Sequence, residues 1–184
     1  MKLYLLPVLL GLACAVTLSA TEPTQPTKKP DPWEPVRFLL GKWAGDSEGE
    51  PGKGKSVREY AFTLSSKFIE VRNQSTYPPQ EKNPKGEVHE DRGMISHDRI
   101  ANKLVLRQFH TEGFVNHYVL ESVSADGRTL VFVSATIENI PAGFRARETY
   151  TKISDDEFAE RFEIAEPGKD FEKYSGALFR RARP

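Results

Sequence analysis

The sequence predicts an all-β protein: an antiparallel up-and-down barrel of about ten strands, preceded by a short helix. Three observations support this prediction. From Lys42 onward, runs with a two-residue period and many β-branched or aromatic residues recur, short turn signals separate them, and no helical periodicity of useful length appears. Such a meander closes more readily than it stays flat, because closure removes unpaired edge strands.

Each element follows from a local signal. The apolar run at residues 33–40 predicts a short helix, which Gly41 ends. Residues 99–102 and 125–127 predict tight turns between neighbouring strands. Residues 49–55, rich in Gly and Lys, lack the spacing of a phosphate-binding loop and predict a flexible hairpin at the barrel mouth. The expected strands are 42–50, 56–64, 67–77, 87–98, 103–111, 114–123, 130–138, 144–153, 157–165 and 170–181.

The N-terminal residues predict export. Residues 1–20 combine Lys2, a short apolar run and small residues ending at Ala20, which is the pattern of a cleaved signal peptide. The run is shorter than the roughly 20 apolar residues that span a bilayer. We therefore expect a periplasmic or secreted protein, with lipid anchoring at Cys14 as the alternative. Residues 21–32, rich in Pro and Thr, predict a disordered linker, and residues 33–184 the barrel domain.

Charge and motifs exclude several classes of function. Lys and Arg total 26, as do Asp and Glu, so the net charge is zero and no single-sign field favours nucleic acid. The sequence contains neither a nucleophile elbow nor a phosphate-cradling glycine loop. The sequence shows no two carboxylates converging as a catalytic pair would. We therefore predict no catalytic residue and no integral membrane span.

Three motifs carry a resemblance to a known family. The start of the barrel resembles the opening of nitrobindins, and its Gly-x-Trp element is similar to the lipocalin signature of the calycins. A middle strand resembles the His-x-Glu-x-Gly strand of nitrobindins through His89 and Gly93, and the chain ends in a similar aromatic-basic run. The resemblance implies a calycin-type barrel, closed at one end by Gly41 and Trp43 with either Arg180 or Arg181 packed on the indole. The opening motif reads Phe38-Leu39-Leu40-Gly41-Lys42-Trp43-Ala44-Gly45, followed by Glu48-Gly49-Glu50.

The same resemblance raises the question of heme. Nitrobindins hold ferric heme through a histidine of the last strand, so membership implies chemistry on nitrogen oxides and, if the protein is an enzyme, heme isomerase activity. Here Tyr174 stands at that position, and no histidine follows His117. Tyrosine ligates ferric heme in catalase, but its free pKa of about 10 requires a nearby base. The sequence assigns no such base.

The predicted ligand contacts are Tyr174 and Gly176. Strand alternation places both on one face, where Gly176 leaves open space beside the phenol ring. The alternative for Tyr174 is an ordinary half-buried strand residue.

The histidines predict no metal site. His89 and His97 lie roughly 26 Å apart on one strand, at about 3.3 Å per residue. If the turn at 99–102 sets the register, His89 lies diagonal to His110 at about 7–8 Å. Two ligands alone make a poor site.

Three functions remain open from sequence. The first is an exported module that holds a small hydrophobic or planar ligand in the barrel lumen. The second is a nitrobindin-like heme protein. The third is a structural domain whose lumen is filled with side chains, which a cavity of several hundred cubic ångströms would contradict.

Overall fold

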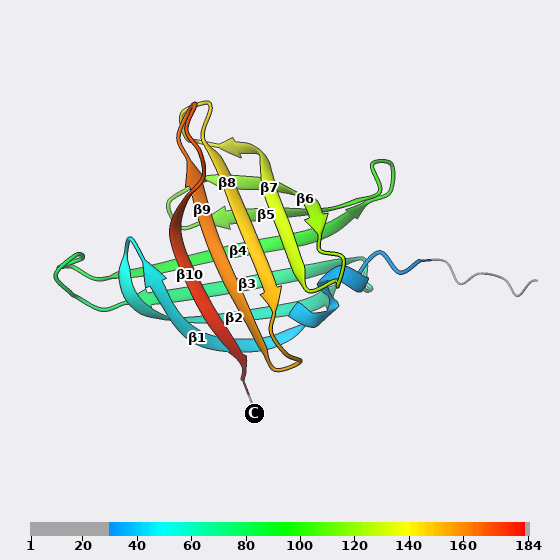
Figure 1. Cartoon of the computed structure of the whole chain (residues 1–184), viewed down its shortest axis with the longest axis horizontal. Helices are drawn as coiled ribbons and strands as arrows, with labels where there is room; N and C mark the ends of the chain where they lie inside the picture. Colours follow the sequence, from blue (N-terminus) through cyan, green and yellow to red (C-terminus); the bar gives the residue numbers. More distant parts are fainter. Residues whose placement is uncertain (1–29, 183–184) are drawn as a thin grey trace, which may run out of the picture. The chain divides into compact units, whose positions relative to one another are not determined.

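The computed structural model describes residues 30–182, which contain one closed antiparallel barrel and a short 3-10 helix, η1 (Glu34–Leu39) (Figure 1). Each strand pairs with its neighbours in sequence, and β10 closes the barrel against β1. The predicted fold class is confirmed. The strands are β1 (Gly41–Gly49), β2 (Gly52–Thr63), β3 (Phe68–Tyr77), β4 (Glu87–Asp98), β5 (Lys103–His110), β6 (Val115–Val123), β7 (Thr129–Glu138), β8 (Arg145–Lys152), β9 (Glu157–Ala165) and β10 (Glu172–Arg181).

The predicted turns set the register of the barrel. Asp98 pairs with Lys103 across residues 99–102, as expected, and Asp98 Oδ1 accepts hydrogen bonds from two backbone N–H groups of that turn. The expected hairpin at the barrel mouth is present, but its turn is shorter than predicted. Gly49 pairs with Gly52, so β2 begins before residue 56 and only Glu50 and Pro51 form the turn.

The N-terminal predictions lie outside the described residues. This applies to the signal at residues 1–20, to Cys14 and to most of the linker at 21–32. Among residues 30–182, no helix is long and apolar enough to cross a membrane.

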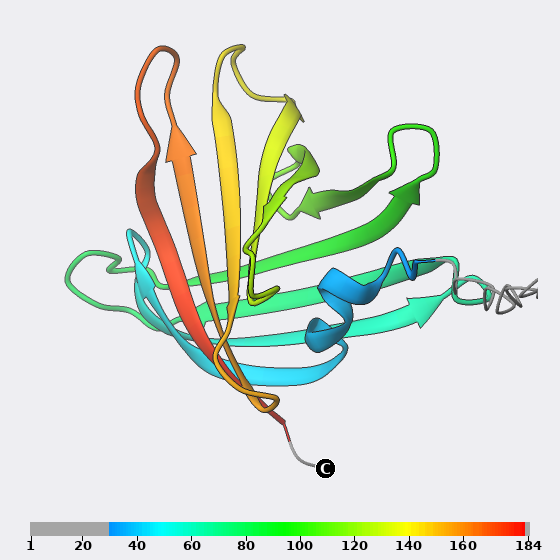
Figure 2. The same ribbon diagram turned by 45° about the vertical axis from the view of Figure 1, so that its right-hand side comes forward.

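One end of the barrel is closed by η1, which lies beside the start of β1 (Figure 2). Val36 and Leu39 of η1 are buried, and Trp43 Nε1 donates a hydrogen bond to the Leu39 carbonyl at 2.7 Å. Next to η1 inside the barrel, the Phe158 ring packs against the rings of Trp43 and Phe179, with centroid distances of 4.8 and 4.9 Å respectively. The apolar core therefore occupies the half of the barrel nearest η1.

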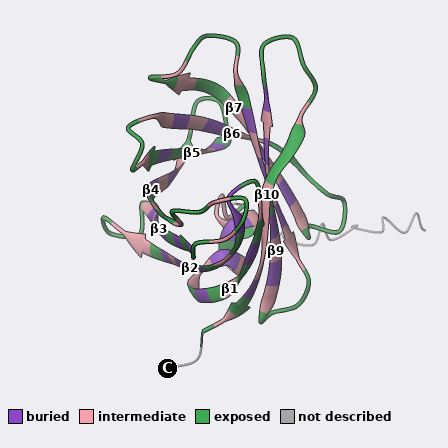
Figure 3. Cartoon of the chain, turned by 90° about the vertical axis from the view of Figure 1, so that its left-hand side faces the viewer, coloured by how far each residue is buried: buried purple, intermediate pink, exposed green. Residues whose placement is uncertain are grey.

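Burial alternates along most strands, as a closed barrel requires (Figure 3). The chemistry of the inward-facing residues changes with distance from η1. On β5, Leu104 and Leu106 are followed by Gln108 and His110. This change from apolar to polar marks the boundary between the packed core and the open half of the lumen.

Candidate functional site

The half of the barrel away from η1 contains a cavity of about 410 Å³. Three loops contribute to its wall, through Pro51, Glu112 and Ile140. Pockets of this volume hold small molecules in many proteins. The half of the lumen away from η1 is therefore not filled by side chains, which argues against the third function that the sequence left open.

A layer of polar side chains forms the floor of the cavity. Seven strands each contribute one member of this polar layer: Arg58, Asn73, Asp91, Gln108, Asn116, Glu148 and Glu160. All seven are at most 9% exposed. Because burying a polar group is costly unless the group is paired, the partners of these residues determine what the cavity can bind.

Arg58 connects several residues of the polar layer through hydrogen bonds. Its three guanidinium nitrogens donate to Glu160, Asn73 and the Tyr60 hydroxyl at 2.6, 3.1 and 3.3 Å. Asn73 Nδ2 donates in turn to Asp91 Oδ2 at 2.6 Å. Burial lowers the pKa of Arg58, but the Glu160 carboxylate and other neighbours raise it by more. The guanidinium is therefore charged, and each of its nitrogens has a partner.

Five buried oxygens of the polar layer have no hydrogen-bond partner within the described residues. By contrast, every buried side-chain nitrogen of residues 30–182 has one. Burial, and then the Glu160 carboxylate, raise the pKa of Glu148 well above its usual range, so Glu148 itself supplies one proton. The polar layer still presents an excess of acceptors to the cavity. The five atoms are Asp91 Oδ1, Gln108 Oε1, Asn116 Oδ1, Glu148 Oε2 and Glu160 Oε2.

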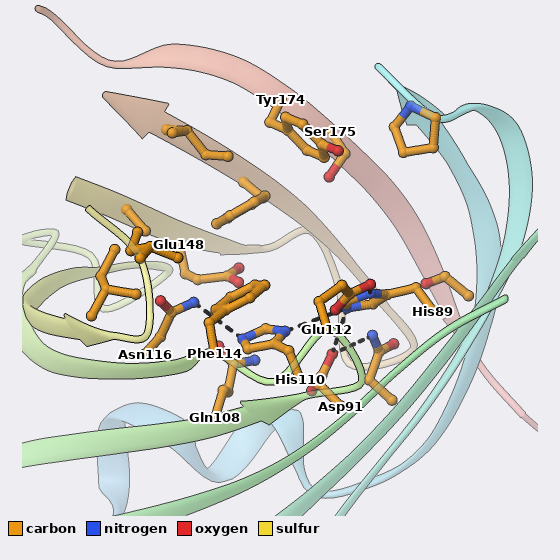
Figure 4. Close-up of a pocket in the computed structure, with 18 of the residues that line it drawn as sticks. His89, Asp91, Gln108, His110, Glu112, Phe114, Asn116, Glu148, Tyr174 and Ser175 are labelled. Carbon is orange, nitrogen blue, oxygen red and sulfur yellow. Dashed lines mark hydrogen bonds and ion pairs between the residues drawn. The ribbon is translucent and has the colours of Figure 1, made fainter. Parts of the chain in front are cut away.

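Two histidines and a carboxylate meet at the rim of the cavity (Figure 4). His89 Nε2 lies 3.4 Å from His110 Nδ1 and 3.7 Å from Asp91 Oδ2, while His89 Nδ1 lies 2.8 Å from Glu112 Oε1. The His110 ring stacks on Phe114 with centroids 4.1 Å apart. The predicted diagonal placement of His89 and His110 is confirmed by the pairing of Asp91 with His110.

The two histidines differ in protonation. The Asp91 carboxylate, assisted by that of Glu112, raises the pKa of His89 to about 9, although partial burial opposes this. Burial lowers the pKa of His110 to about 4. At neutral pH, His89 is therefore a cation held between two carboxylates, and His110 is neutral.

The structure places Tyr174 on the cavity wall, across from the histidines (Figure 4). Its ring packs edge-on against Phe162, with centroids 5.7 Å apart. A ligand-binding role for Tyr174 stays a prediction.

The expectation for Gly176 is wrong. The register between β10 and β9 shifts between Lys173 and Ser175, so Tyr174 and Ser175 both line the cavity. Gly176 lies away from it, and a Cβ there would come within 3.0 Å of the Glu160 carbonyl oxygen. This bulge shifts by one residue the set of β10 side chains that faces the cavity.

The residues predicted to close the barrel lie at the η1 end. The Arg181 guanidinium lies 4.2 Å from the Trp43 ring centroid, and its Nη1 donates to the Leu40 carbonyl at 3.0 Å. A Cβ at Gly41, which has a φ of +115°, would approach Arg181 Nη1 to 2.7 Å. Arg180 instead forms an exposed ion pair with Glu157. Of the two arginines that the sequence left open, Arg181 contacts the indole.

The two residues of the middle family motif lie at different depths. His89 lies at the rim, whereas Gly93 lies farther inside. A Cβ at Gly93 would lie 3.2 Å from both Val71 and Leu106, so glycine allows a close approach of side chains from β3 and β5. Gly93 therefore serves packing, while His89 faces the cavity.

The residues at the family's heme position do not fit heme. A phenolate ligand to iron needs a neighbouring positive charge to lower its pKa. Burial and the nearby carboxylates, Glu87 first among them, instead raise the pKa of Tyr174. The cavity floor is also crossed by the ionic pair of Arg58 and Glu160, in place of the apolar faces that a porphyrin ring packs against.

Sequence reasoning missed the polar layer and Glu112. A usable signal was present, because several members of the layer stand two residues from a buried apolar residue on the same strand. Gln108 follows Leu106 in this way, and Glu160 follows Phe158. Glu112 carries no such signal, because it lies in the turn between β5 and β6.

The fold and cavity define a closed, ten-stranded antiparallel β-barrel with a pocket in its lumen. No family model matches the sequence, and no curated protein matches it. The structure is similar to the crystal structure of Rv2717c from M. tuberculosis, with a TM-score of 0.62 and 18% identity over 85% of this chain and 100% of that one. A de novo designed fluorescence-activating β-barrel matches with a TM-score of 0.42 and 15% identity, over 81% of this chain and 98% of that one. The first likeness supports the fold.

Proposed function

We propose that this protein is an exported binding barrel for a small amphipathic molecule. The ligand's apolar body lies against the cavity wall, and its hydrogen-bond donors face the polar layer. The observation that carries this proposal is the excess of buried acceptors lining one cavity: Glu148 carries a proton for Glu160, and Asp91 Oδ1, Gln108 Oε1 and Asn116 Oδ1 still have no partner among the described residues.

The wall above the polar layer supports an apolar ligand body. Its side chains come mainly from β7, β9 and the loop between β7 and β8, and include Ile137, Ile140, Phe144, Phe162 and Ile164. Burial of apolar surface is worth about 25 cal/mol per Å². This wall therefore supplies affinity without selecting a particular molecule.

The polar layer supports an N–H-bearing head. Leaving a buried polar group unpaired costs about 1–3 kcal/mol, and ligand donors would relieve that cost at several oxygens. The Arg58 nitrogens are already engaged, so a ligand carboxylate would find acceptors where it needs donors. The charges of Asp91 and Glu160 are balanced by His89 and Arg58, so the preference for N–H donors comes from the unpartnered oxygens.

Three probes with the same alkyl chain test this selectivity. We expect isothermal titration calorimetry to show that decylamine binds most tightly, decanol less tightly and decanoate at least about tenfold more weakly than decylamine. Gln108→Leu removes one acceptor of the polar layer and should weaken decylamine binding about tenfold. Ser47→Ala is the matched control, because Ser47 Oγ is also buried and unpartnered but does not line the cavity.

Two results contradict the proposed ligand class. One is decanoate binding as tightly as decylamine, and the other is an equal effect of Gln108→Leu and Ser47→Ala. Binding of none of the three probes, together with no co-purifying mass in native mass spectrometry, contradicts a binding function altogether.

Export is the part of the proposal that rests on residues 1–20 alone. Intact mass of protein recovered outside the cytoplasm of a secreting host tests it. Loss of about the first 20 residues supports cleavage by a signal peptidase. Retention of the full chain inside the cell contradicts export, and a diacylglyceryl mass at Cys14 identifies the lipid-anchored alternative.

A further inference from the structure

The three side chains at the cavity rim have the composition of a metal site. His89 projects from β4, His110 ends β5, and Glu112 follows in the next turn. One ligand atom from each of the three lies within 4.8 Å of the others. Two imidazoles and one carboxylate, with the remaining position open, form the ligand set of a class of zinc sites.

We propose that His89, His110 and Glu112 bind one divalent transition-metal ion of the zinc type, with its open coordination position facing the cavity. This site lies above the polar layer and goes beyond the proposed binding of an amphipathic molecule. It requires no ligand in the cavity below.

The spacing of the two histidines matches this geometry. With metal–nitrogen bonds of about 2.1 Å, two ligands of a tetrahedral ion lie roughly 3.4 Å apart. His89 Nε2 and His110 Nδ1 are separated by 3.4 Å. This separation suits one shared ion, and binding it requires His89, which is protonated at neutral pH, to release its Nε2 proton.

The carboxylate reaches the same ion by a side-chain rotation. Glu112 Oε1 now lies beside His89 Nδ1, at 2.8 Å, on the other side of the ring from Nε2. The Glu112 side chain is 47% exposed, so it rotates at little cost in packing. Asp91 provides a further oxygen nearby, because Oδ2 lies 3.7 Å from His89 Nε2 and Oδ1 has no partner among the described residues.

The surroundings of His110 support a ligand role. Phe114 stacks on the imidazole and holds its orientation. The amide of Asn116 lies beside the distal nitrogen, with Nδ2 at 3.1 Å from His110 Nε2, while Asn116 Oδ1 has no partner among residues 30–182. Amide oxygen and nitrogen orientations are interchangeable by a flip. The flipped amide accepts the Nε2–H of a metal-bound imidazole, which is the outer-shell contact that metal-bound histidines usually make. In that state Asn116 no longer offers its oxygen to a ligand in the cavity, and Asp91 and Gln108 remain as acceptors there.

The donor set selects the class of metal. Ca²⁺ and Mg²⁺ prefer oxygen ligands throughout. Imidazole nitrogens favour ions such as Zn²⁺, Co²⁺, Ni²⁺ and Cu²⁺. We therefore expect Zn²⁺ to bind and Mg²⁺ to leave the site empty.

The other two histidines provide matched controls. His117 pairs with Glu138 at 2.5 Å, which repeats the histidine–carboxylate contact without a second imidazole. His97 contacts Asn102. Within residues 30–182, neither belongs to a group of three such ligands.

Calorimetric titration of the chelator-treated protein with Zn²⁺ tests the site. We expect one ion per chain, and at least about tenfold weaker binding in both His110→Ala and Glu112→Gln. His117→Ala should bind as the unaltered protein does. Co²⁺ provides a second readout, because a tetrahedral site gives intense visible absorption bands that an octahedral aqua ion lacks.

Several outcomes overturn the site. They are no Zn²⁺ binding, binding unchanged by both Glu112→Gln and His110→Ala, or an equal loss in His117→Ala. Because Glu112→Gln changes an exposed side chain in a turn, the fold should be unaffected, and weaker Zn²⁺ binding by this variant would report on the metal site itself. The decylamine experiment remains separable, because Gln108→Leu should leave the Zn²⁺ affinity unchanged.

Discussion

The inward-facing side chains of strand β9 belong to both halves of the barrel, the packed half near η1 and the open half with the cavity. Phe158 is fully buried in the aromatic cluster near η1, Glu160 belongs to the polar layer, and Phe162 borders the cavity. The same strand geometry therefore supports close packing at one end and an incompletely satisfied pocket at the other. The comparison indicates that the closed half supplies stability, while the open half retains polar groups at a cost in stability.

The largest expected difference lies between the two phenylalanines of β9. Phe158→Ala should lower the free energy of unfolding by about 3–5 kcal/mol, because it leaves a cavity in a packed core. Phe162→Ala should cost about 1–2 kcal/mol, because its ring already borders open space and only transfer free energy is lost. Urea denaturation measures both. Equal losses would contradict the division of the barrel into a packed half and an open half.

The second prediction concerns the pH dependence that the polar layer imposes. Because the folded-state pKa of Glu148 is raised above the unfolded value of about 4.3, the folded protein holds this proton more tightly. Its contribution to stability is complete below that value and declines as the pH rises, by at most about 1.4 kcal/mol per pH unit. Glu148→Gln should remove the decline, so its stability relative to the unaltered protein should grow from pH 4 to pH 7 in urea titrations.

Glu163 is the control for that experiment, with the opposite sign. Hydrogen bonds from Arg147 lower the pKa of Glu163 in the folded state. Its contribution is present above the unfolded pKa and is lost as the pH falls through the folded pKa. Glu163→Gln should therefore destabilise the protein at neutral pH and have less effect in acid. A gain in neutral-pH stability for both variants would argue against a special environment at Glu148.

Most of the barrel was predictable because its contacts follow the chain order. Each hairpin joins strands that are adjacent in sequence, and a local turn such as 99–102 sets the register between β4 and β5. This register was sufficient to predict from the sequence that His89 and His110 lie close together. The error at Gly176 arose from a single bulged residue, which alternation alone does not reveal.

The chemistry of the cavity was much less predictable than the strands. The ion pair of Arg58 and Glu160 joins residues 102 positions apart, and it forms only because the barrel closes. Glu112 lies in a turn, where no periodicity indicates which way a side chain points. Pairwise reasoning on strands therefore found two of the three rim residues and missed the third, which completes the proposed metal site.

The smallest expected difference lies at the closed end, between the neighbouring arginines of β10. Arg181→Ala should cost about 1–2 kcal/mol in free energy of unfolding, because it removes the stacking on Trp43 and the hydrogen bond to the Leu40 carbonyl. Arg180→Ala should change stability by about 0.5 kcal/mol or less, since its ion pair with Glu157 is exposed. Arg181→Lys keeps the charge but loses the planar group that stacks on the indole, so an intermediate value in the same urea titrations separates stacking from charge. If Arg180→Ala proved as costly as Arg181→Ala, the closure of the barrel would depend on the net charge of the last strand, and the stack on Trp43 would lose its assigned role.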